Sequence, residues 1–301
     1  MSAAGSLSMT AVSSFPQRLR DYLELTKPRL SSLVLVTTAA GFWLGVREVG
    51  SLSVLIPVCV GTALVVGGAN AMNQWMERIP DALMSRTQHR PLPSGRLTPT
   101  EAFRFGVVLS GVGILFLAVA VNGLSALLAV IGWVSYVLIY TPLKRMTPLC
   151  TVVGAIPGAL PPVIGWAGAG HGLGIEAWIL FVILFVWQFP HFLALAVMYR
   201  DDFARAGFRF LPIGDRDGLA TARQMTSYGL ALLPASLFPA MIGLGGPVYF
   251  FGALGLSLVF LGITLRAAIH RSLLACQHLF LASVLYLPGL LALLACDRAP
   301  L

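Results

Sequence analysis

Three side chains that could bind a metal ion recur at helical spacing near the end of an early apolar segment. They are Asn73, Glu77 and Asp81, each four residues from the next, so on a helix they would lie along one face. Carboxylate and amide oxygens are ligands that hard cations such as Mg²⁺ accept in proteins. We interpret the set as a candidate metal motif. An ordinary polar loop is the alternative, but such a loop does not require this spacing.

A cluster of basic residues follows this acidic set directly. The segment reads RTQHRPLPSGR and contains Arg86, Arg90 and Arg96. Guanidinium groups beside carboxylates suit a metal-bridged, multiply charged anion such as a diphosphate. The alternative is a loop whose basic residues only set the orientation of the chain in a membrane.

A second acidic set, Asp201 and Asp202, follows a later apolar segment. It lies in YRDDFARAGFRFLPIGDRDG, again among arginines. The two acidic sets lie in the only long loops that we predict, and long loops are often functional. Both sets are therefore candidates for one binding site.

The composition is that of a membrane protein. Of the 301 residues, 57% are apolar and only 11% are charged, whereas a soluble domain is about half apolar and about a quarter charged. Apolar segments of spanning length occur at roughly 30–46, 52–72, 102–121, 124–141, 149–168, 176–198, 225–244, 247–266 and 278–296. We therefore predict an all-α, polytopic membrane bundle of nine transmembrane helices.

Prolines distinguish the fifth apolar segment. Pro157, Pro161 and Pro162 are expected to interrupt it, which makes it the least helical of the nine. Broken backbone at membrane depth is tolerated only where it is buried in protein or lines a cavity. A bent helix beside a substrate cavity and a kinked packing helix both remain open.

The basic residues are distributed asymmetrically. All but two of the 20 lysines and arginines lie in the N-terminal segment or after even-numbered spans, and the exceptions are Arg47 and Arg298. By the positive-inside rule, the N-terminus and these loops are cytoplasmic. The two acidic loops then emerge on the same face, where they could close over one metal-bound diphosphate. This distribution also explains the net charge of +8 without a nucleic-acid partner.

The N-terminal region and the cysteines carry little further signal. We interpret residues 1–24 as a tail and surface segment. The stretch QRLRDYLELTKPR, residues 17–29, is amphipathic and is expected to lie on the membrane surface. The Ser/Ala-rich start lacks the features of a cleavable signal peptide. The four cysteines show no CxxC or Cys/His spacing, so neither a disulfide framework nor a zinc site is predicted.

Three blocks of sequence match a known family. They are Asn70–Arg96, Tyr140–Trp166 (beginning YTPLKR) and Trp187–Pro212 (beginning WQFPHF). The chain resembles the UbiA-type intramembrane prenyltransferases over about residues 25–294, and YTPLKR and WQFPHF point to the branch that modifies haem. The resemblance implies one transmembrane prenyltransferase domain, residues 25–298, with its helices around a central cavity. It also implies a cell-membrane location with the catalytic loops on the cytoplasmic face.

The resemblance further implies the reaction and its site. A farnesyl group would pass from farnesyl diphosphate to a vinyl group of haem B, giving haem O, with Mg²⁺ as cofactor. Asn73, Glu77 and Asp81 would form the first metal motif, and Asp201 and Asp202 the second. The candidate residues for binding the diphosphate or haem are Asn70, Arg86, Arg90, Tyr140, Lys144, Arg145, His191 and Arg200. Besides the lipid bilayer, an enzyme that receives haem O is an expected partner.

The first motif departs from the family pattern at two places. Glu77 stands where the family usually has Asp, and Ile79 and Pro80 replace another acid and an apolar residue. Glutamate still offers an oxygen ligand on a longer arm. Pro80 would clash with the carbonyl of Met76 in a continuous helix. We therefore predict a kink before Asp81.

His191 lies deep in the sixth apolar segment, within WQFPHF. A polar side chain is costly there and usually faces the interior of the bundle. A purely structural histidine and a histidine that contacts haem are both consistent with this position.

Two other functions stay open. One is prenyl transfer to an aromatic acceptor such as hydroxybenzoate, for which the WQFPHF block would not be expected. The other is transport of an anionic solute. Transporters tend to place ionisable groups near the bilayer midplane, whereas nearly every acid here lies at a predicted cytoplasmic end.

Overall fold

The structure, a computed structural model, describes residues 15–46 and 53–298. The expectations of an N-terminal tail and of no signal peptide fall largely on residues outside these ranges. The described helices are α1 (Phe15–Leu25), α2 (Pro28–Gly45), α3 (Leu55–Met76), α4 (Arg78–Ala82), α5 (Pro99–Ala120), α6 (Gly123–Val134), the π-helix η2 (Ser135–Tyr140), α7 (Thr141–Leu143), α8 (Cys150–Gly168), α9 (Ile175–Met198), α10 (Arg200–Arg205), α11 (Leu211–Gly214), α12 (Leu219–Met241), α13 (Pro247–His270) and α14 (Leu273–Cys296).

Each predicted apolar segment coincides with a long helix, which confirms the all-α fold. The nine segments correspond to α2, α3, α5, the run α6–η2–α7, α8, α9, α12, α13 and α14. By length and composition, seven of the helices in the described residues qualify as membrane-crossing, and α2 and α12 are not among them. Both begin with polar stretches, PRLSS in α2 and LATARQMTS in α12. The count of nine crossings therefore stays a prediction.

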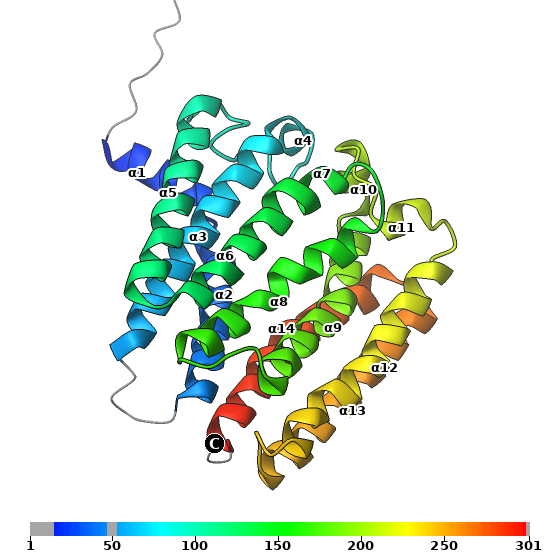
Figure 1. Cartoon of the computed structure of the whole chain (residues 1–301). Coiled ribbons are helices and arrows are strands. Elements are labelled where there is room, and N and C mark those ends of the chain that lie inside the picture. The colour runs from blue at the N-terminus through cyan, green and yellow to red at the C-terminus, as the bar shows by residue number, and fades with distance from the viewer. Residues whose placement is uncertain (1–14, 47–52, 299–301) are drawn as a thin grey trace, which may run out of the picture.

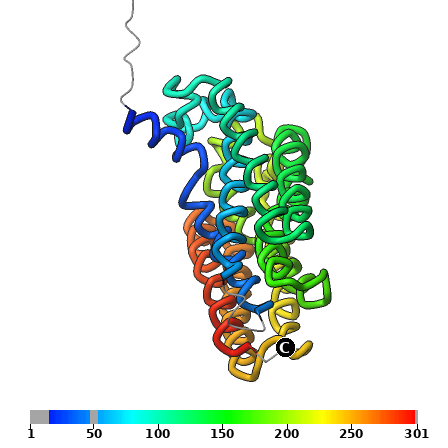
Figure 2. Tube along the Cα trace, turned by 60° about the vertical axis from the view of Figure 1, so that its left-hand side comes forward, coloured from blue at the N-terminus to red at the C-terminus, as the bar shows by residue number. Residues whose placement is uncertain are grey.

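The polar segments gather at one end of the bundle. In Figure 1, α1, α4, α7, α10 and α11 all lie at the end opposite the C-terminus. Figure 2 shows α1 running obliquely at this end, out of line with the long helices. The two acidic loops meet at this end, as expected for loops that emerge on one face, since Ser85 of the first donates from Oγ to Asp202 of the second at 3.2 Å.

Close packing of α2 against α8 sets one wall of the interior. A Cβ on Gly41 would lie 1.9 Å from the Pro162 carbonyl oxygen, and a Cβ on Gly165 would lie 1.9 Å from that of Thr38. Only glycine permits such an approach, and small residues of this kind are typical of helix contacts in membranes. The two backbones therefore touch directly.

The helical irregularity lies in the fourth apolar segment and not in the fifth. α8 runs continuously over Cys150–Gly168 with all three prolines inside it, so the expected interruption is wrong. Neighbouring helices and local adjustment can accommodate proline in a membrane helix. The fourth segment instead contains the π-helix Ser135–Tyr140, where Thr141 Oγ1 donates to the Tyr136 carbonyl at 2.8 Å. Short π-helical segments often occur at functional sites.

Candidate active site

A cavity of about 640 Å³ lies among α2, α3, η2, α8, α9 and α14. Its lining divides into two parts. One part, which we call the charged mouth, consists of Lys27, Asn70, Asn73, Glu77, Asp81, Arg86, Arg90 and Lys144. The remainder is mainly aliphatic and aromatic, with side chains such as Val65, Leu160, Leu184 and Leu287. The arrangement suits a ligand that has a charged head and an apolar body.

The break between α3 and α4 places the first acidic motif on the cavity wall. α3 ends at Met76, Glu77 has φ −93° and ψ 11°, and α4 begins at Arg78. The Asp81 amide still donates to the Glu77 carbonyl at 2.7 Å. The predicted kink before Asp81 is thus confirmed, and its cause is Pro80, which cannot continue the helix that precedes it.

Glu77 and Asp81 are buried, and each lies beside a basic side chain. Lys144 Nζ is 2.8 Å from Glu77 Oε1, and Arg90 Nη1 is 2.7 Å from Asp81 Oδ2. Burial alone would lower the pKa of Lys144, but the Glu77 carboxylate and other nearby groups raise it above its ordinary value. Asp81 Oδ1 has no hydrogen-bond partner in the described part of the chain. A buried carboxylate oxygen without a partner is costly, and a bound cation would satisfy it.

Asn73 is held by Lys27, a residue that the sequence analysis missed. Lys27 Nζ donates to Asn73 Oδ1 at 2.8 Å. Its φ of 50° is left-handed and uncommon for a side-chain-bearing residue, and such strain often accompanies functional sites. Burial, then repulsion from Arg90 and Lys144, lowers the pKa of Lys27 to about 7. The available signal was a lysine directly before the first apolar segment, where a basic residue is usually taken as a topology marker.

Several other predicted residues reach the same cavity. Arg86 lies 5.1 Å from the centre of the Tyr199 ring, and Lys144 Nζ lies 4.6 Å from that of Tyr140. Asn70 Nδ2 donates to the Thr26 carbonyl at 3.1 Å. The predicted residues that line the cavity are Asn70, Asn73, Glu77, Asp81, Arg86, Arg90, Tyr140, Lys144 and His191.

The second acidic motif lies outside the cavity lining. Asp202 forms an ion pair with Arg205, and Asp201 is exposed. Arg200 Nη2 points to the Ile213 carbonyl at 3.4 Å, and Arg145 is exposed. In the described ranges, no three or more His, Cys, Asp or Glu side chains are placed to hold a metal together. The roles of these four residues therefore stay predictions.

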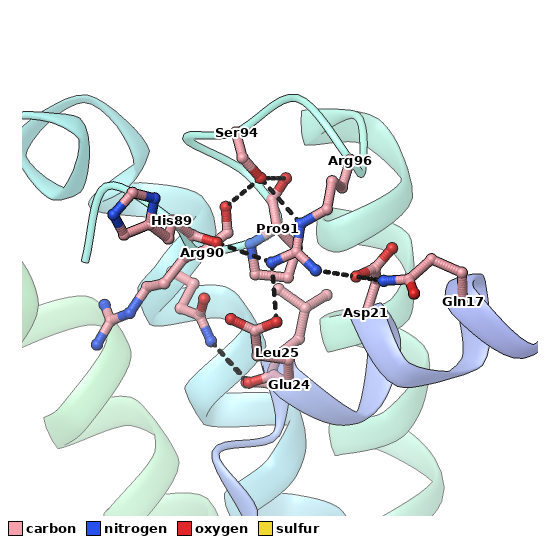
Figure 3. Close-up of polar contacts among 10 residues, drawn as sticks. Gln17, Asp21, Glu24, Leu25, His89, Arg90, Pro91, Ser94 and Arg96 are labelled. Atoms are coloured by element: carbon pink, nitrogen blue, oxygen red, sulfur yellow. Dashed lines mark hydrogen bonds and ion pairs between the residues drawn. The ribbon is translucent and has the colours of Figure 1, made fainter. Parts of the chain in front are cut away.

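Arg96 ties α1 to the loop that carries Arg90. Its Nη1 pairs with Asp21 and its Nη2 with Glu24 Oε2 at 2.9 Å, and Nη2 also donates to the His89 carbonyl at 2.8 Å. Figure 3 shows these contacts between α1 and the loop. Asp21 is fully buried, so α1 does more than cover the surface. It anchors the segment from which Arg90 reaches the first motif.

The deeper part of the cavity contains His191. Its ring stacks against those of Trp187 on α9 and Phe280 on α14, with centroids 5.0 Å and 4.8 Å away. Its Nδ1 lies 2.8 Å from Ser283 Oγ. Gln188, one turn earlier, also lines the cavity and donates to the Ala155 carbonyl at 3.2 Å.

The fold and the cavity define a helical membrane protein built to hold a charged head group beside an apolar body. The chain belongs to the UbiA prenyltransferase family, whose model matches residues 34–287. This confirms the resemblance expected from the three sequence blocks, and the protein is a prenyltransferase.

Proteins named protoheme IX farnesyltransferase are among its relatives. That of Solibacter usitatus is 47% identical over 289 residues, covering 93% of this chain and 99% of its own. That of Myxococcus xanthus is 41% identical over 288 residues, covering 95% and 97%. That of Aquifex aeolicus is 39% identical over 280 residues, covering 93% and 95%.

Solved structures share the fold at low sequence identity. A digeranylgeranylglyceryl phosphate synthase superposes with a TM-score of 0.78 at 17% identity, covering 93% of this chain and 98% of its own. A UbiA homologue from Archaeoglobus fulgidus, bound to GPP and Mg²⁺, has a TM-score of 0.65 at 16% identity and covers 91% and 99%. These likenesses confirm the fold of a multi-pass membrane protein.

Proposed function

We propose that the protein transfers the farnesyl group of farnesyl diphosphate to a vinyl group of haem B, giving haem O. The observation that carries the proposal is the two-part cavity, in which an acidic and basic mouth joins an apolar interior. The mouth suits the diphosphate, and the interior suits the farnesyl chain and the porphyrin. Relatives with the corresponding name, aligned over nearly the whole chain, support the choice of substrates.

Asn73, Glu77 and Asp81 are the residues proposed to hold Mg²⁺. All three line the cavity, and the unpartnered Asp81 Oδ1 is an open acceptor for a cation. When bound, Mg²⁺ supplies positive charge that stabilises the departing diphosphate. The Archaeoglobus fulgidus homologue, bound to GPP and Mg²⁺, supports a role for Mg²⁺ in this protein.

The basic residues of the mouth would neutralise the diphosphate oxygens. Lys27, Arg86, Arg90 and Lys144 all line the cavity beside the acidic motif. Fixed positive charges placed where negative charge develops contribute strongly to catalysis. Asp201 and Asp202, with Arg200, would complete the site from the segment that Ser85 already contacts. Arg145 would do so from the loop between α7 and α8.

The apolar interior would protect the reaction from water. The allylic C–O bond breaks and its electron pair leaves with the diphosphate, so a farnesyl cation forms. The vinyl group of haem donates its π electrons to that cation and forms the new C–C bond. Water adds to the resulting haem-side cation and loses a proton, which gives the hydroxyethylfarnesyl group. A dry cavity limits premature capture by water, and no protein nucleophile is required.

The proposal also includes the orientation of the protein in the membrane and the enzyme that receives its product. The N-terminus and the charged mouth would face the cytoplasm, because most basic residues lie at that end. The product is apolar and membrane-bound, so it would pass to a haem O-using enzyme in the same membrane.

Mass analysis of haem tests the proposal directly. Membranes that contain the protein are incubated with haem B, farnesyl diphosphate and Mg²⁺, beside membranes without it. We expect haem to gain one hydroxyethylfarnesyl group only where the protein is present. If an aromatic acid is prenylated under the same conditions while haem stays unchanged, the acceptor is wrong.

A further inference from the structure

The His191 ring is fixed in the cavity and is bonded through only one of its nitrogens. Its plane is tilted only 23° from that of Trp187 and 28° from that of Phe280, so the two rings restrict its rotation. Nδ1 lies 2.8 Å from Ser283 Oγ. Nε2 has no hydrogen-bond partner among the described residues, and His191 lines the cavity. The edge away from Ser283 is thus available to a ligand.

The bonds of Ser283 determine which nitrogen of His191 carries the proton. Ser283 Oγ lies 2.6 Å from the Phe280 carbonyl oxygen. A carbonyl only accepts, and a serine hydroxyl has one hydrogen to donate. Ser283 Oγ therefore accepts from His191, so Nδ1 carries the hydrogen. In a neutral imidazole, Nε2 then has a free lone pair.

Ser283 is itself held in place. Its side chain is fully buried, and its carbonyl accepts from Trp187 Nε1 at 2.9 Å. Trp187 and His191 lie on α9, whereas Ser283 lies on α14. A histidine that binds a metal generally donates its other ring N–H to a fixed acceptor, which sets the tautomer and the ring orientation. Ser283 Oγ is such a fixed acceptor for the Nδ1–H group of His191.

We propose that His191 Nε2 is an axial ligand to the iron of the haem acceptor, and that Ser283 is the positioning residue that keeps this nitrogen unprotonated. The inference rests on the proposed function and explains how the protein would select an iron porphyrin as the acceptor. Imidazole is a common axial ligand of haem iron. An iron porphyrin should therefore bind more tightly than the same porphyrin without iron. Ligation would hold the macrocycle in the apolar part of the cavity, as transfer to one vinyl group requires.

Optical titration of the purified protein tests the ligation. Iron protoporphyrin and metal-free protoporphyrin are titrated separately into the wild type and His191→Ala. We expect the wild type to shift the Soret band of the iron form and to bind it more tightly than the metal-free form. His191→Ala should lose the shift and the preference, and added imidazole should restore the shifted band, which would show that the variant is folded.

Ser283→Ala tests the positioning role. We expect its affinity for iron protoporphyrin to fall about 10- to 100-fold, with no change for the metal-free form. Ser283→Thr retains a hydroxyl and should recover most of the loss. Ser257→Ala is the matched control, because Ser257 is also buried and bonds Tyr286 at 2.8 Å but lies outside the cavity lining. It should bind both porphyrins as the wild type does.

The outcomes separate the inference from the proposed function. A wild-type spectrum and affinity in His191→Ala would overturn the ligation. Loss of the Soret shift in His191→Ala together with unchanged binding in Ser283→Ala would overturn the role of Ser283 alone. Failure of wild-type membranes to farnesylate haem would instead overturn the proposed function.

Discussion

At the scale of single residues, each member of the first motif is paired with a cation from another segment. The pairs are Lys27 with Asn73, Lys144 with Glu77, and Arg90 with Asp81. A buried carboxylate needs such compensation, since removing one partner of a buried pair leaves an uncompensated charge. If Mg²⁺ takes over the acidic side chains, the same cations become available to the diphosphate.

Neutralising Glu77 should impair the chemical step. Glu77→Gln removes a charged oxygen next to the departing diphosphate, and the loss of such an electrostatic group costs about 10²- to 10³-fold in rate. Glu77→Asp restores the usual family residue and should keep activity. Turnover is measured in membranes with equal amounts of each variant. Glu176→Gln, at the first turn of α9 and outside the cavity lining, is the control and should turn over normally.

Asp202→Asn tests whether the second motif enters the site when substrate is bound. If Asp202 becomes a metal ligand, we again expect a loss of about 10²- to 10³-fold in rate. If it only pairs with Arg205, the effect should be small, because exposed ion pairs contribute about 0–1 kcal/mol. Arg205→Gln breaks the same pair and leaves the carboxylate, so it should keep near-normal activity. Normal turnover in both variants would exclude Asp202 from the metal site.

At the scale of elements, the contact between α1 and the first loop should influence substrate binding. Arg96→Ala removes the links to Asp21, Glu24 and the loop backbone. The loop that positions Arg90 would then lose its anchor. We expect KM for farnesyl diphosphate to rise about 10- to 100-fold, since even one hydrogen bond to a charged group is worth about 1.5–3 kcal/mol, with a smaller fall in kcat.

A control on the same helix separates this effect from general damage to α1. Arg18 on α1 pairs with Glu101 on α5 at a more exposed position. Arg18→Gln should therefore leave KM unchanged. Asp21→Asn, which retains the shape of the side chain but weakens the pair with Arg96, should raise KM in the same direction as Arg96→Ala. An unchanged KM in both of those variants would contradict the anchoring role.

Local patterns made part of this site predictable from the sequence. The spacing of Asn73, Glu77 and Asp81 required only helical periodicity, and Pro80 alone predicted the break after Met76. The lengths of the apolar segments predicted the long helices, because each helix forms from the residues of a single segment. Such features are encoded over a few turns of helix.

Features that depend on the meeting of distant helices were not predictable in this way. Lys27 is 46 residues from Asn73, and Ser283 is 92 residues from His191. Each residue looks ordinary within its own segment. The π-helix at Ser135–Tyr140 likewise lacks a marker such as proline or glycine within SYVLIY. The three prolines of α8 were a misleading marker, because packing against α2 and other helices keeps that helix continuous.

At the scale of the whole molecule, the arrangement separates charge from the apolar interior. The short helices α4, α7, α10 and α11 cluster with α1 at one end (Figure 1). The exposed side chains of α1 include Phe15, Leu19 and Leu23, which are spaced to form one apolar stripe. A helix with such a stripe suits the membrane interface. The prediction that α1 lies on the membrane surface therefore agrees with its exposed face.

The orientation of the bundle can be tested with reporter tags. We expect tags at the N-terminus, near Gln88 and near Asp215 to report the cytoplasm, and a tag near Gly172 to report the opposite side. The reason is the positive-inside rule, since in the sequence all lysines and arginines but Arg47 and Arg298 belong to the N-terminal segment or follow even-numbered predicted spans. Gly172 lies between α8 and α9, away from the charged mouth. Each tag is read by accessibility to a membrane-impermeant reagent in intact and in opened cells. Labelling of the Gly172 tag only after the cells are opened would reverse the assigned orientation, and labelling of Gln88 and Asp215 on different sides would contradict the shared face of the two acidic loops.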